Sequence, residues 1–158
     1  MAFYGYSNTG KSSALNALTQ QRKLANISKI PGRTQLINLF EVTKNIKLVD
    51  LPGYGYTKVS KSLKRQWQKR LTEYLQKRKC LRGLIILMDI RHPLKDIDLQ
   101  IIEWSMVRNI QIFVLLSKAD IMNSNKQKNQ IIEVRNRLKI VDSNIEVEIF
   151  SSFKKNRC

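Results

Sequence analysis

A short stretch near the start of the chain has the residue types and spacing needed to hold a phosphate. Residues 5–13 read GYSNTGKSS, a glycine and four further residues followed by Gly-Lys-Ser. In this P-loop pattern successive backbone N–H groups wrap a phosphate at a helix N-terminus, and Gly5 and Gly10 permit the tight turn and close approach. Lys11 would reach the outer phosphates as a point charge, and the Ser12 hydroxyl would bind the magnesium ion that bridges them. The stretch predicts a nucleotide phosphate site.

A second candidate for phosphate and metal chemistry is DLPGYG at residues 50–55. An aspartate that closes a strand suits a Walker-B role, in which Asp50 orients magnesium through water and the Gly53 amide senses the terminal phosphate. Alone, Pro52 and Gly53 would be read as a simple turn. Because the stretch follows a P-loop and a strand, the nucleotide interpretation is favoured.

Two polar stretches further along the chain could recognise a base. SKAD at residues 117–120 ends in a carboxylate, and the Asp120 side chain could accept hydrogen bonds from the N1–H and exocyclic amine of guanine. The Lys118 stem would pack over the base and steady the P-loop. In FSS, residues 150–152, a backbone amide could meet the guanine carbonyl oxygen. Alone, SKAD is more often a strand-ending turn and FSS carries no signal, but in order after a P-loop they predict a guanine nucleotide.

These motifs are positioned by strands and helices that alternate along the chain. Short apolar runs alternate with longer amphipathic ones, as in a mostly parallel sheet with crossover helices. We predict strands at 2–4, 35–42, 46–50, 81–90, 111–120 and 145–150, and helices at 11–20, 61–79, 94–107 and 127–140. The second and third strands would form a hairpin joined by Thr43, Lys44 and Asn45. The motifs then fall at the carboxyl ends of strands, where ligands of open α/β sheets bind.

Length and composition favour one small domain. The 158 residues suffice for one compact core, and 42% hydrophobic residues fit a globular protein. The longest apolar runs fall well short of the roughly 20 residues of a membrane span, and the start of the chain lacks the pattern of a secretory signal. Cys80 and Cys158 have no metal-like spacing, so we expect reduced thiols, a cytoplasmic location and no membrane partner.

The charge is strongly positive and unevenly placed. A formal net charge of +17 points to a polyanion, most plausibly nucleic acid, although AT-rich coding would also enrich Lys, Ile and Asn and remains a partial explanation. Between residues 58 and 82 the single acid is Glu73. The basic residues there are Lys58, Lys61, Lys64, Arg65, Lys69, Arg70, Lys77, Arg78, Lys79 and Arg82. The sequence therefore predicts a basic helix that binds RNA.

Taken together, the motifs resemble the P-loop GTPases related to translation factors, and most closely the EngB family of bacterial ribosome-assembly GTPases. The matching stretches are GYSNTGKSSALNALT (5–19), KIPGRTQLINLFEV (29–42), LVDLPGYGY (48–56), LMDIRHPLKDID (87–98), LLSKAD (115–120) and FSSFKK (150–155). The resemblance implies a Ras-like three-layer fold with a six-stranded sheet, one strand antiparallel. It covers nearly the whole chain, and PGRTQLIN and DIRHPLKD are its most specific parts.

The resemblance also implies function and site residues. Thr34 would be the switch threonine that completes the magnesium shell, with catalysis assigned to Lys11, Thr34 and Gly53. The implied GTP-binding residues are Gly5, Tyr6, Ser7, Asn8, Thr9, Gly10, Lys11, Ser12, Ser13, Gly32, Arg33, Thr34, Gln35, Leu36, Asp50, Leu51, Pro52, Gly53, Ser117, Lys118, Ala119, Asp120, Phe150, Ser151 and Ser152. Magnesium would be bound directly by Ser12 and Thr34 and through water by Asp50. The implied partners are GTP and GDP, the large ribosomal subunit and its rRNA, and the implied role includes cell division and septation. Ser117 departs from the Thr or Asn usual in the family.

Hydrolysis is expected to be slow without assistance. Tyr54 stands where Ras-type enzymes carry the glutamine that orients the attacking water, and a phenol cannot replace a carboxamide there. Asn8 either helps to hold a potassium ion against the phosphates, as in similar GTPases, or merely tolerates a left-handed turn. Arg33 is either an arginine finger, supplied by this chain itself to stabilise charge during hydrolysis, or a solvated side chain. His92 is assigned no chemistry, and Asp89, Arg91 and Asp96 begin a helix or contact a partner.

Three further expectations complete the interpretation. Relatives extend beyond both ends of this chain, so a single domain over 1–158 would be incomplete at its N- and C-termini and would lack the final helix. One face of the sheet near the first strand would then be exposed, and the chain, predicted to be a monomer, would be marginally stable without nucleotide. The alternative function is a basic rRNA-binding module with a vestigial or non-hydrolysing nucleotide site.

Overall fold

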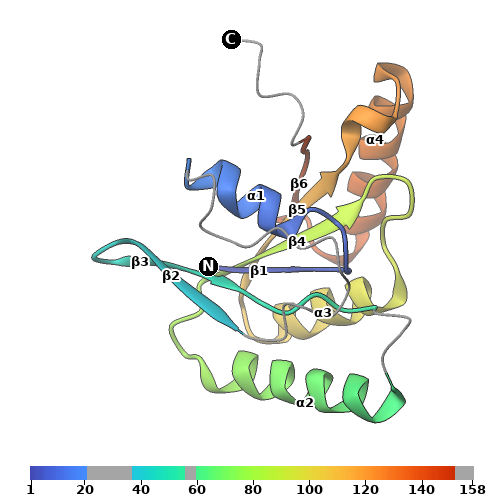
Figure 1. The fold of residues 1–158 in the computed structure, drawn as a ribbon. Coiled ribbons are helices and arrows are strands. Elements are labelled where there is room, and N and C mark those ends of the chain that lie inside the picture. Colours follow the sequence, from blue (N-terminus) through green and yellow to red (C-terminus); the bar gives the residue numbers. More distant parts are fainter. Residues whose placement is uncertain (21–36, 56–59, 152–158) are drawn as a thin grey trace.

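The chain folds around one mixed sheet, as Figure 1 shows. The structure is a computed structural model that describes residues 1–20, 37–55 and 60–151, apart from the side chains at 63, 64, 67, 68 and 70. The strands are β1 (Ala2–Gly5), β2 (Asn38–Thr43), β3 (Ile46–Asp50), β4 (Gly83–Asp89), β5 (Gln111–Ser117) and β6 (Glu146–Ile149). The helices are α1 (Lys11–Leu18), α2 (Lys61–Lys77), α3 (Asp96–Val107) and α4 (Ser124–Val141), with a 3₁₀ turn, η1, at Ala119–Ile121.

The sheet has the predicted topology. Its strand order is β2-β3-β1-β4-β5-β6, with β2 antiparallel to β3 and the other pairs parallel. β1 lies at the centre, where the short buried run Ala2–Gly5 pairs with β3 on one side and β4 on the other. The prediction of a six-stranded sheet with one antiparallel strand is confirmed.

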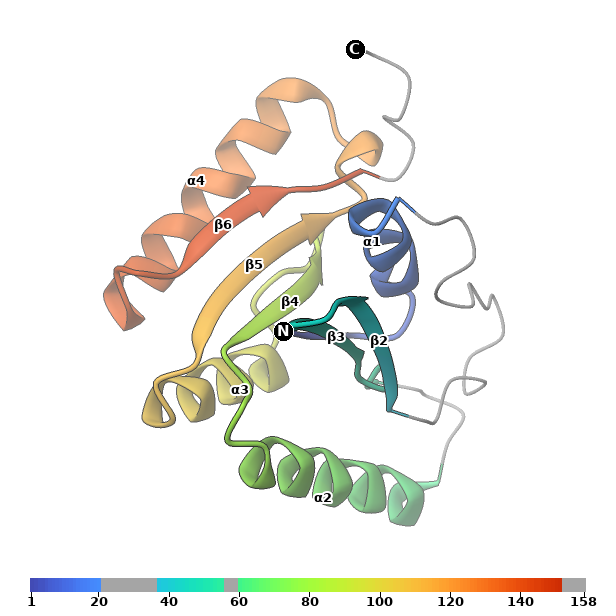
Figure 2. The ribbon, with the colours of Figure 1, turned by 90° about the vertical axis from the view of Figure 1, so that its left-hand side faces the viewer.

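The helices cover both faces of the sheet, because side chains alternate along each buried strand. Tyr4, Ile86 and Val114 join a core cluster with Leu75 of α2 and residues of α3 and α4. The neighbouring strand residues Phe3, Ile85 and Leu87 pack instead with Ala14 and Leu15 of α1. Figure 2 shows α2 and α3 on one side of the sheet and α1 on the other. These are the three layers expected from the sequence.

Coverage of the α1 face is uneven, in part agreement with the sequence expectation. Ile85 and Leu87 of β4 are buried there. On the same face, Phe113 and Leu115 of the next strand, β5, are only half-buried. The less covered region therefore lies over β5 rather than near β1.

Several predicted boundaries shift. Strand β2 continues through Thr43, which was expected in the turn. Helix α2 ends at Lys77 rather than 79, and α3 begins at Asp96 rather than 94, since Leu94 has a positive φ of 56°. Helix α4 begins at Ser124, three residues earlier than expected, because the Asn123 side chain accepts a hydrogen bond from the Lys126 N–H at 2.9 Å. Pro31 and Gly32 in the sequence predict a mobile loop over 21–34, and this segment lies outside the described residues.

Candidate functional site

The predicted motifs meet at one edge of the sheet. In the parallel register Gly5 pairs with Leu87, Asp89 with Ser117, and Leu116 with Ile149. The carboxyl ends of β1, β4, β5 and β6 therefore lie along the same edge, and β3 joins them through the pairing of Phe3 with Asp50. The P-loop, DLPG, SKAD and FSS each begin there.

The P-loop has the backbone conformation that its glycines allow. Gly10 is left-handed, with φ 84°, and caps α1, whose first bond runs from the Ala14 N–H to the Gly10 carbonyl at 2.9 Å. A side chain on Gly5 would meet the Leu87 carbonyl oxygen and the Thr9 Oγ1 atom at 2.8 Å each, so this position requires glycine. The Thr9 hydroxyl donates to the Tyr6 carbonyl at 2.8 Å and closes the loop. The loop is a turn leading directly into a helix N-terminus, the geometry that binds anions.

Asn8 adopts the left-handed conformation, with φ 64°. The backbone of Asn8 therefore has the left-handed conformation that the turn interpretation predicts. Its side chain is exposed, so the potassium role stays a prediction.

Lys11 and Asp50 form a buried ion pair between the P-loop helix and the end of β3. Their side chains are 9% and 2% exposed. Ser12, the next residue of α1, is half-buried. The groups predicted to serve the outer phosphates and their metal thus lie side by side.

The donors at this point fit magnesium. The Ser12 hydroxyl and the Asp50 carboxylate supply oxygen, which Mg²⁺ prefers, and Mg²⁺ in such sites keeps waters and phosphate oxygens as its other ligands. Among the described residues no cluster of three or more His, Cys, Asp or Glu side chains could hold a metal by itself.

The segment after Gly53 is tied to the P-loop by aromatic packing. The Tyr54 ring stacks on Tyr4 at 4.6 Å between centroids and meets Tyr6 edge-on at 5.3 Å. The Ser7 N–H donates to the Tyr54 carbonyl at 2.7 Å, and the Tyr54 N–H donates to the Gly5 carbonyl at 3.3 Å. Tyr54 is buried, and its hydroxyl has no hydrogen-bond partner among the described residues. This tyrosine packs in the core here, in keeping with the expectation that it does not orient a catalytic water.

The half-buried Tyr6 side chain packs against its neighbours. The Lys95 ammonium lies 3.6 Å from the centroid of its ring, and the ring rests on the backbone of Gly55. The Tyr6 side chain thus links the P-loop to the residue before α3, and its assignment as a nucleotide contact stays a prediction.

At the other end of the edge, the two base-recognition stretches contact each other. The Ser151 Oγ donates to the Asp120 carboxylate at 2.6 Å. The Ala119 N–H donates to the Phe150 carbonyl at 3.3 Å, and the Phe150 N–H to the Leu116 carbonyl at 2.8 Å. Asp120 is exposed. SKAD and the first two residues of FSS therefore form one surface on which a carboxylate is held and faces outward.

Ser117 and Lys118 have contacts that the sequence did not predict. The buried Ser117 hydroxyl donates to the Met88 carbonyl at 3.1 Å, which ties β5 to β4. The Lys118 ammonium donates at 2.9 Å to Asp89, which the sequence left as a helix start or a partner contact and which is the last residue of β4. Asp89 and Arg91 lie in the DIRHPLKD stretch, which the sequence singled out without a defined role, and their place at the end of β4 is the signal that could have linked them to the site.

Six predicted site residues lie outside the described part of the chain. They are Gly32, Arg33, Thr34, Gln35, Leu36 and Ser152. Their assignments stay predictions.

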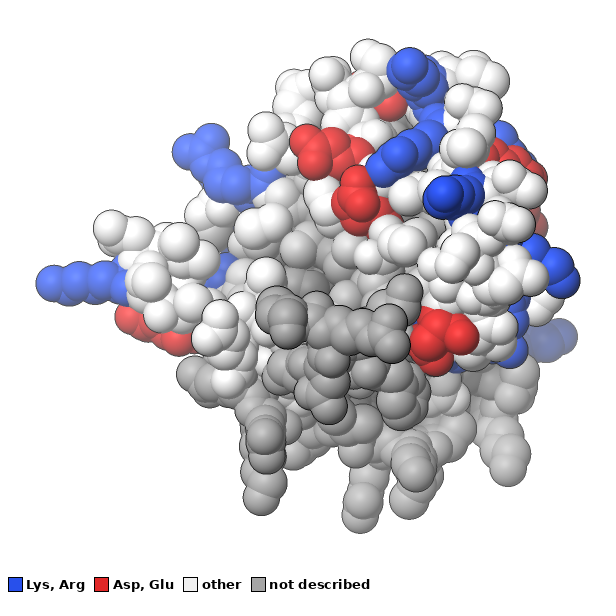
Figure 3. Space-filling model, turned by 90° about the horizontal axis from the view of Figure 1, so that it is seen from above, with Lys and Arg blue, Asp and Glu red and all other residues white. Residues whose placement is uncertain are grey.

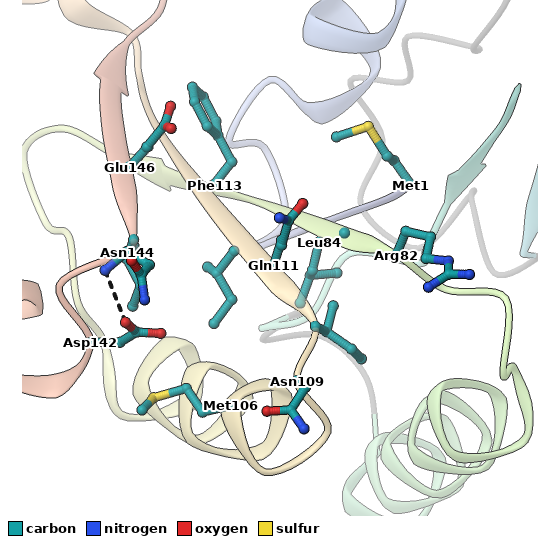
Figure 4. A pocket seen from close by; sticks show the side chains of 14 residues that line it. Met1, Arg82, Leu84, Met106, Asn109, Gln111, Phe113, Asp142, Asn144 and Glu146 are labelled. Atoms are coloured by element: carbon teal, nitrogen blue, oxygen red, sulfur yellow. Dashed lines mark hydrogen bonds between the residues drawn. The ribbon is translucent and has the colours of Figure 1, made fainter.

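A pocket of about 820 Å³ lies at the opposite edge of the sheet. Met1, Leu84, Gln111 and Glu146 line it near the amino ends of β1, β4, β5 and β6, as Figure 4 shows. None of the predicted site residues contributes to it. We locate the candidate site at the carboxyl edge, where the motifs converge, and not in this pocket.

Comparisons with known proteins agree with this geometry. A family profile described as "50S ribosome-binding GTPase" matches residues 1–118. The chain is 59% identical over 155 residues to a probable GTP-binding protein EngB of Photorhabdus laumondii, covering 98% of this chain and 74% of that protein. It is 58% identical over 156 residues to the EngB of Klebsiella pneumoniae strain 342, covering 99% of this chain and 74% of that protein.

Solved structures share the fold. A crystal structure of a probable GTP-binding protein EngB has a TM-score of 0.75 at 20% identity, covering 96% of this chain and 88% of that one. A single-residue variant of Aquifex aeolicus Era bound to GDP·AlF4⁻ has a TM-score of 0.71 at 21% identity, covering 97% of this chain and 50% of that one. The fold is thus that of P-loop GTPases, and the sequence matches establish that this chain belongs to the EngB family of GTP-binding proteins.

Proposed function

We propose that the chain binds GTP and GDP with magnesium at the carboxyl edge of the sheet and hydrolyses GTP slowly. The observation that carries the proposal is the Asp120–Ser151 contact on the same edge as the P-loop and the Lys11–Asp50 pair. One end of that edge offers a carboxylate for the guanine N1–H and amine, and the other offers helix N–H groups and an ammonium for phosphates. A single nucleotide would join the two ends.

Each proposed role follows from the chemistry of this chain's residues. The P-loop amides and Lys11 would bind the phosphates, and Ser12, Thr34 and Asp50 would hold magnesium, which when bound neutralises charge on the phosphate oxygens. The Gly53 amide would sense the terminal phosphate. Tyr54, which stands in the place of the water-orienting glutamine, is packed in the core, and this supports slow intrinsic turnover. Equal turnover in potassium and sodium chloride would exclude the ion role of Asn8.

We further propose a role in assembly of the large ribosomal subunit, and through it in normal cell division and septation, with the chain acting as a cytoplasmic monomer. Membership in a family described as "50S ribosome-binding GTPase" supports the ribosomal part. No helix in the described residues is both long and apolar enough to cross a membrane.

The basic helix supports an RNA partner. Lys61, Arg65, Lys69 and Lys77 are exposed on α2 and Arg78 directly after it, while Leu71 and Leu75 are buried toward the sheet. On the face seen from above in Figure 3, acidic side chains lie among the basic ones. The concentration of positive charge on α2 therefore favours it as the surface for rRNA phosphates.

Titration with fluorescent GDP, with and without magnesium and with unlabelled GDP or ADP as competitor, tests the nucleotide proposal. We expect displacement by GDP and not by equal ADP, because adenine lacks the paired donors for Asp120. Displacement by both nucleotides alike would refute guanine specificity. Undetectable GDP binding with retained rRNA binding would favour the basic RNA-binding module.

A further inference from the structure

A compact ion cluster lies at the end of β4, beside the residues proposed to bind guanine. The Asp89 carboxylate accepts hydrogen bonds from the Arg91 backbone N–H at 3.0 Å, from its Nε at 2.9 Å and from its Nη2 at 2.6 Å. A fourth hydrogen bond comes from the Lys118 ammonium at 2.9 Å. The Arg91 hydrogen bonds, more than the charge of Lys118, hold the pKa of Asp89 well below its usual range. The carboxylate is therefore charged and fixed in orientation.

The backbone places Asp89 and Lys118 across from each other. Asp89 is the last residue of β4 and pairs in register with Ser117, the last residue of β5. The Ile90 N–H donates to the Ser117 carbonyl at 3.1 Å, and the Ser117 hydroxyl donates back to Met88. The two strand ends are thus locked together immediately before Lys118.

Lys118 is fixed at both ends of its side chain. Its backbone is left-handed, with φ 60°, and its carbonyl accepts from the Ile121 N–H at 3.1 Å. Its ammonium is held by Asp89 on the neighbouring strand. The four methylene groups therefore span from β5 toward the end of β4, two residues before Asp120.

We propose that Asp89, oriented by Arg91, is a positioning residue that holds the Lys118 stem as a preformed apolar platform for the guanine ring. The inference rests on the proposed function, because it assumes that Asp120 binds the base edge. Asp120 would then read the donors in the plane of the ring while the Lys118 methylenes cover one face. A free lysine has several rotatable bonds, and ordering them only when the nucleotide arrives would weaken binding.

The competing explanation is that the Asp89–Lys118 ion pair only stabilises the fold. The two explanations predict different combined effects of Asp89 and Lys118 substitutions on GDP affinity. If Asp89 acts through Lys118, removing its charge matters for GDP affinity only while the lysine is present. If the cluster only stabilises the fold, the effects of the two changes on GDP affinity add.

The experiment measures GDP affinity of the full chain by displacement of fluorescent GDP. Four variants are compared with the unmodified chain: Asp89→Asn, Lys118→Met, the double variant, and Asp96→Asn as a control. Asp96 is an exposed aspartate in the first turn of α3, so its replacement removes the same charge from the same stretch. We expect Asp89→Asn to weaken GDP binding about tenfold, Asp96→Asn to leave it within about twofold, and the double variant to match Lys118→Met.

Three results would overturn the inference. One is unchanged affinity in Asp89→Asn, and another is additive losses in the double variant. The third is an absence of GDP binding by the unmodified chain, which refutes the proposed function itself and is thereby distinguishable. Should Asp89→Asn fail to fold, Arg91→Gln takes its place, because it removes the two side-chain hydrogen bonds that orient the carboxylate. A loss of about threefold in GDP affinity then supports the inference, and unchanged affinity overturns it.

Discussion

At the scale of single residues, the site depends on contacts that leave little freedom. The Lys11–Asp50 pair is buried, and a buried pair is costly to break because either partner alone remains uncompensated. Gly5 and Gly55 occupy positions where a methyl group would meet the Leu87 carbonyl and the Tyr6 ring, respectively. These residues fix the P-loop and the segment after Gly53 relative to each other.

Replacing Gly55 with alanine tests this contact. The added Cβ would lie 1.9 Å from the Tyr6 ring, at a backbone φ of +80°. We expect Gly55→Ala to lower the free energy of unfolding by about 2 kcal/mol or more, from backbone strain and displacement of the ring. Urea unfolding measures this change.

Gly83→Ala is the matched control. The nearest atom to its added Cβ lies 3.6 Å away, an ordinary contact. Its cost should stay below about 1 kcal/mol. Equal losses for the two variants would show that the Tyr6 contact is not what requires glycine at 55.

At the scale of elements, the spacing of apolar residues predicted the strands and helices well. It did not predict which polar side chains would be buried. Strand β3 was predicted over 46–50, its observed range, and the apolar runs of β4 and β5 identified buried strands. Ile97, Ile101, Ile102 and Trp104 have the helical spacing that predicts a buried apolar stripe, but on α3 only Ile102 is fully buried, and the other three lie at the margin of the core. Asp98 and Ser105 are buried instead, which no apolar pattern signals. The α4 boundary was missed because a side-chain cap, and not apolar spacing, decides where that helix begins.

The candidate site also has a part that could be predicted from the sequence and a part that could not. The P-loop, DLPG and SKAD motifs are local in sequence and could be read directly. The Asp89–Lys118 bond joins residues 29 positions apart, and the side chain of Tyr6 turns toward Lys95, so both depend on tertiary packing. Contacts of this kind need coordinates.

The buried acid on α3 gives a prediction about pH. Asp98 is 2% exposed, one of its oxygens has no partner among the described residues, and the other accepts from the Lys95 N–H at 3.0 Å. Burial raises the pKa of Asp98 to about 7, against the weaker opposing effect of that hydrogen bond. Between the ordinary pKa of 3.8 and this value, the folded chain keeps a proton that the unfolded chain has released, so stability falls as pH rises.

Asp98→Asn should remove this dependence, since asparagine can still accept from the Lys95 N–H. At pH 8 we expect the variant to be more stable than the unmodified chain by on the order of 2 kcal/mol, and at pH 4 the difference should be small. Urea unfolding at both pH values measures it, with exposed Asp96→Asn as control. A stability difference that does not change with pH would refute the buried charge.

At the scale of the whole molecule, the two main features are the proposed nucleotide site and the basic helix α2. The proposed nucleotide site follows the carboxyl edge of the sheet, and the exposed basic residues of α2 follow the DLPG segment in the chain. Loops that respond to the terminal phosphate can alter a neighbouring docking surface. We therefore expect affinity for large-subunit particles to differ between GDP and a non-hydrolysable GTP analogue, and identical affinities would contradict the coupling.

Charge reversal locates the docking surface. Exposed Lys69 and Lys77 lie on α2, and exposed Lys128 and Lys139 lie on α4. Reversing either pair to glutamate changes the net charge equally. We expect the α2 pair to weaken binding and to reduce the salt dependence by about two phosphate contacts, and the α4 pair to have a smaller effect. Equal effects would show that net charge alone drives binding.

The central claim is that Asp120 reads a guanine base at the carboxyl edge. Its most direct test is the affinity of Asp120→Asn for GDP and for xanthosine diphosphate. Xanthine carries a carbonyl where guanine carries its amine, so the asparagine amide would donate where the aspartate accepted. We predict that GDP binding weakens about 100-fold or more, from the loss of two charge-assisted hydrogen bonds, while xanthosine diphosphate binding improves. GDP affinity unchanged in this variant, with no gain for xanthosine diphosphate, would contradict the account.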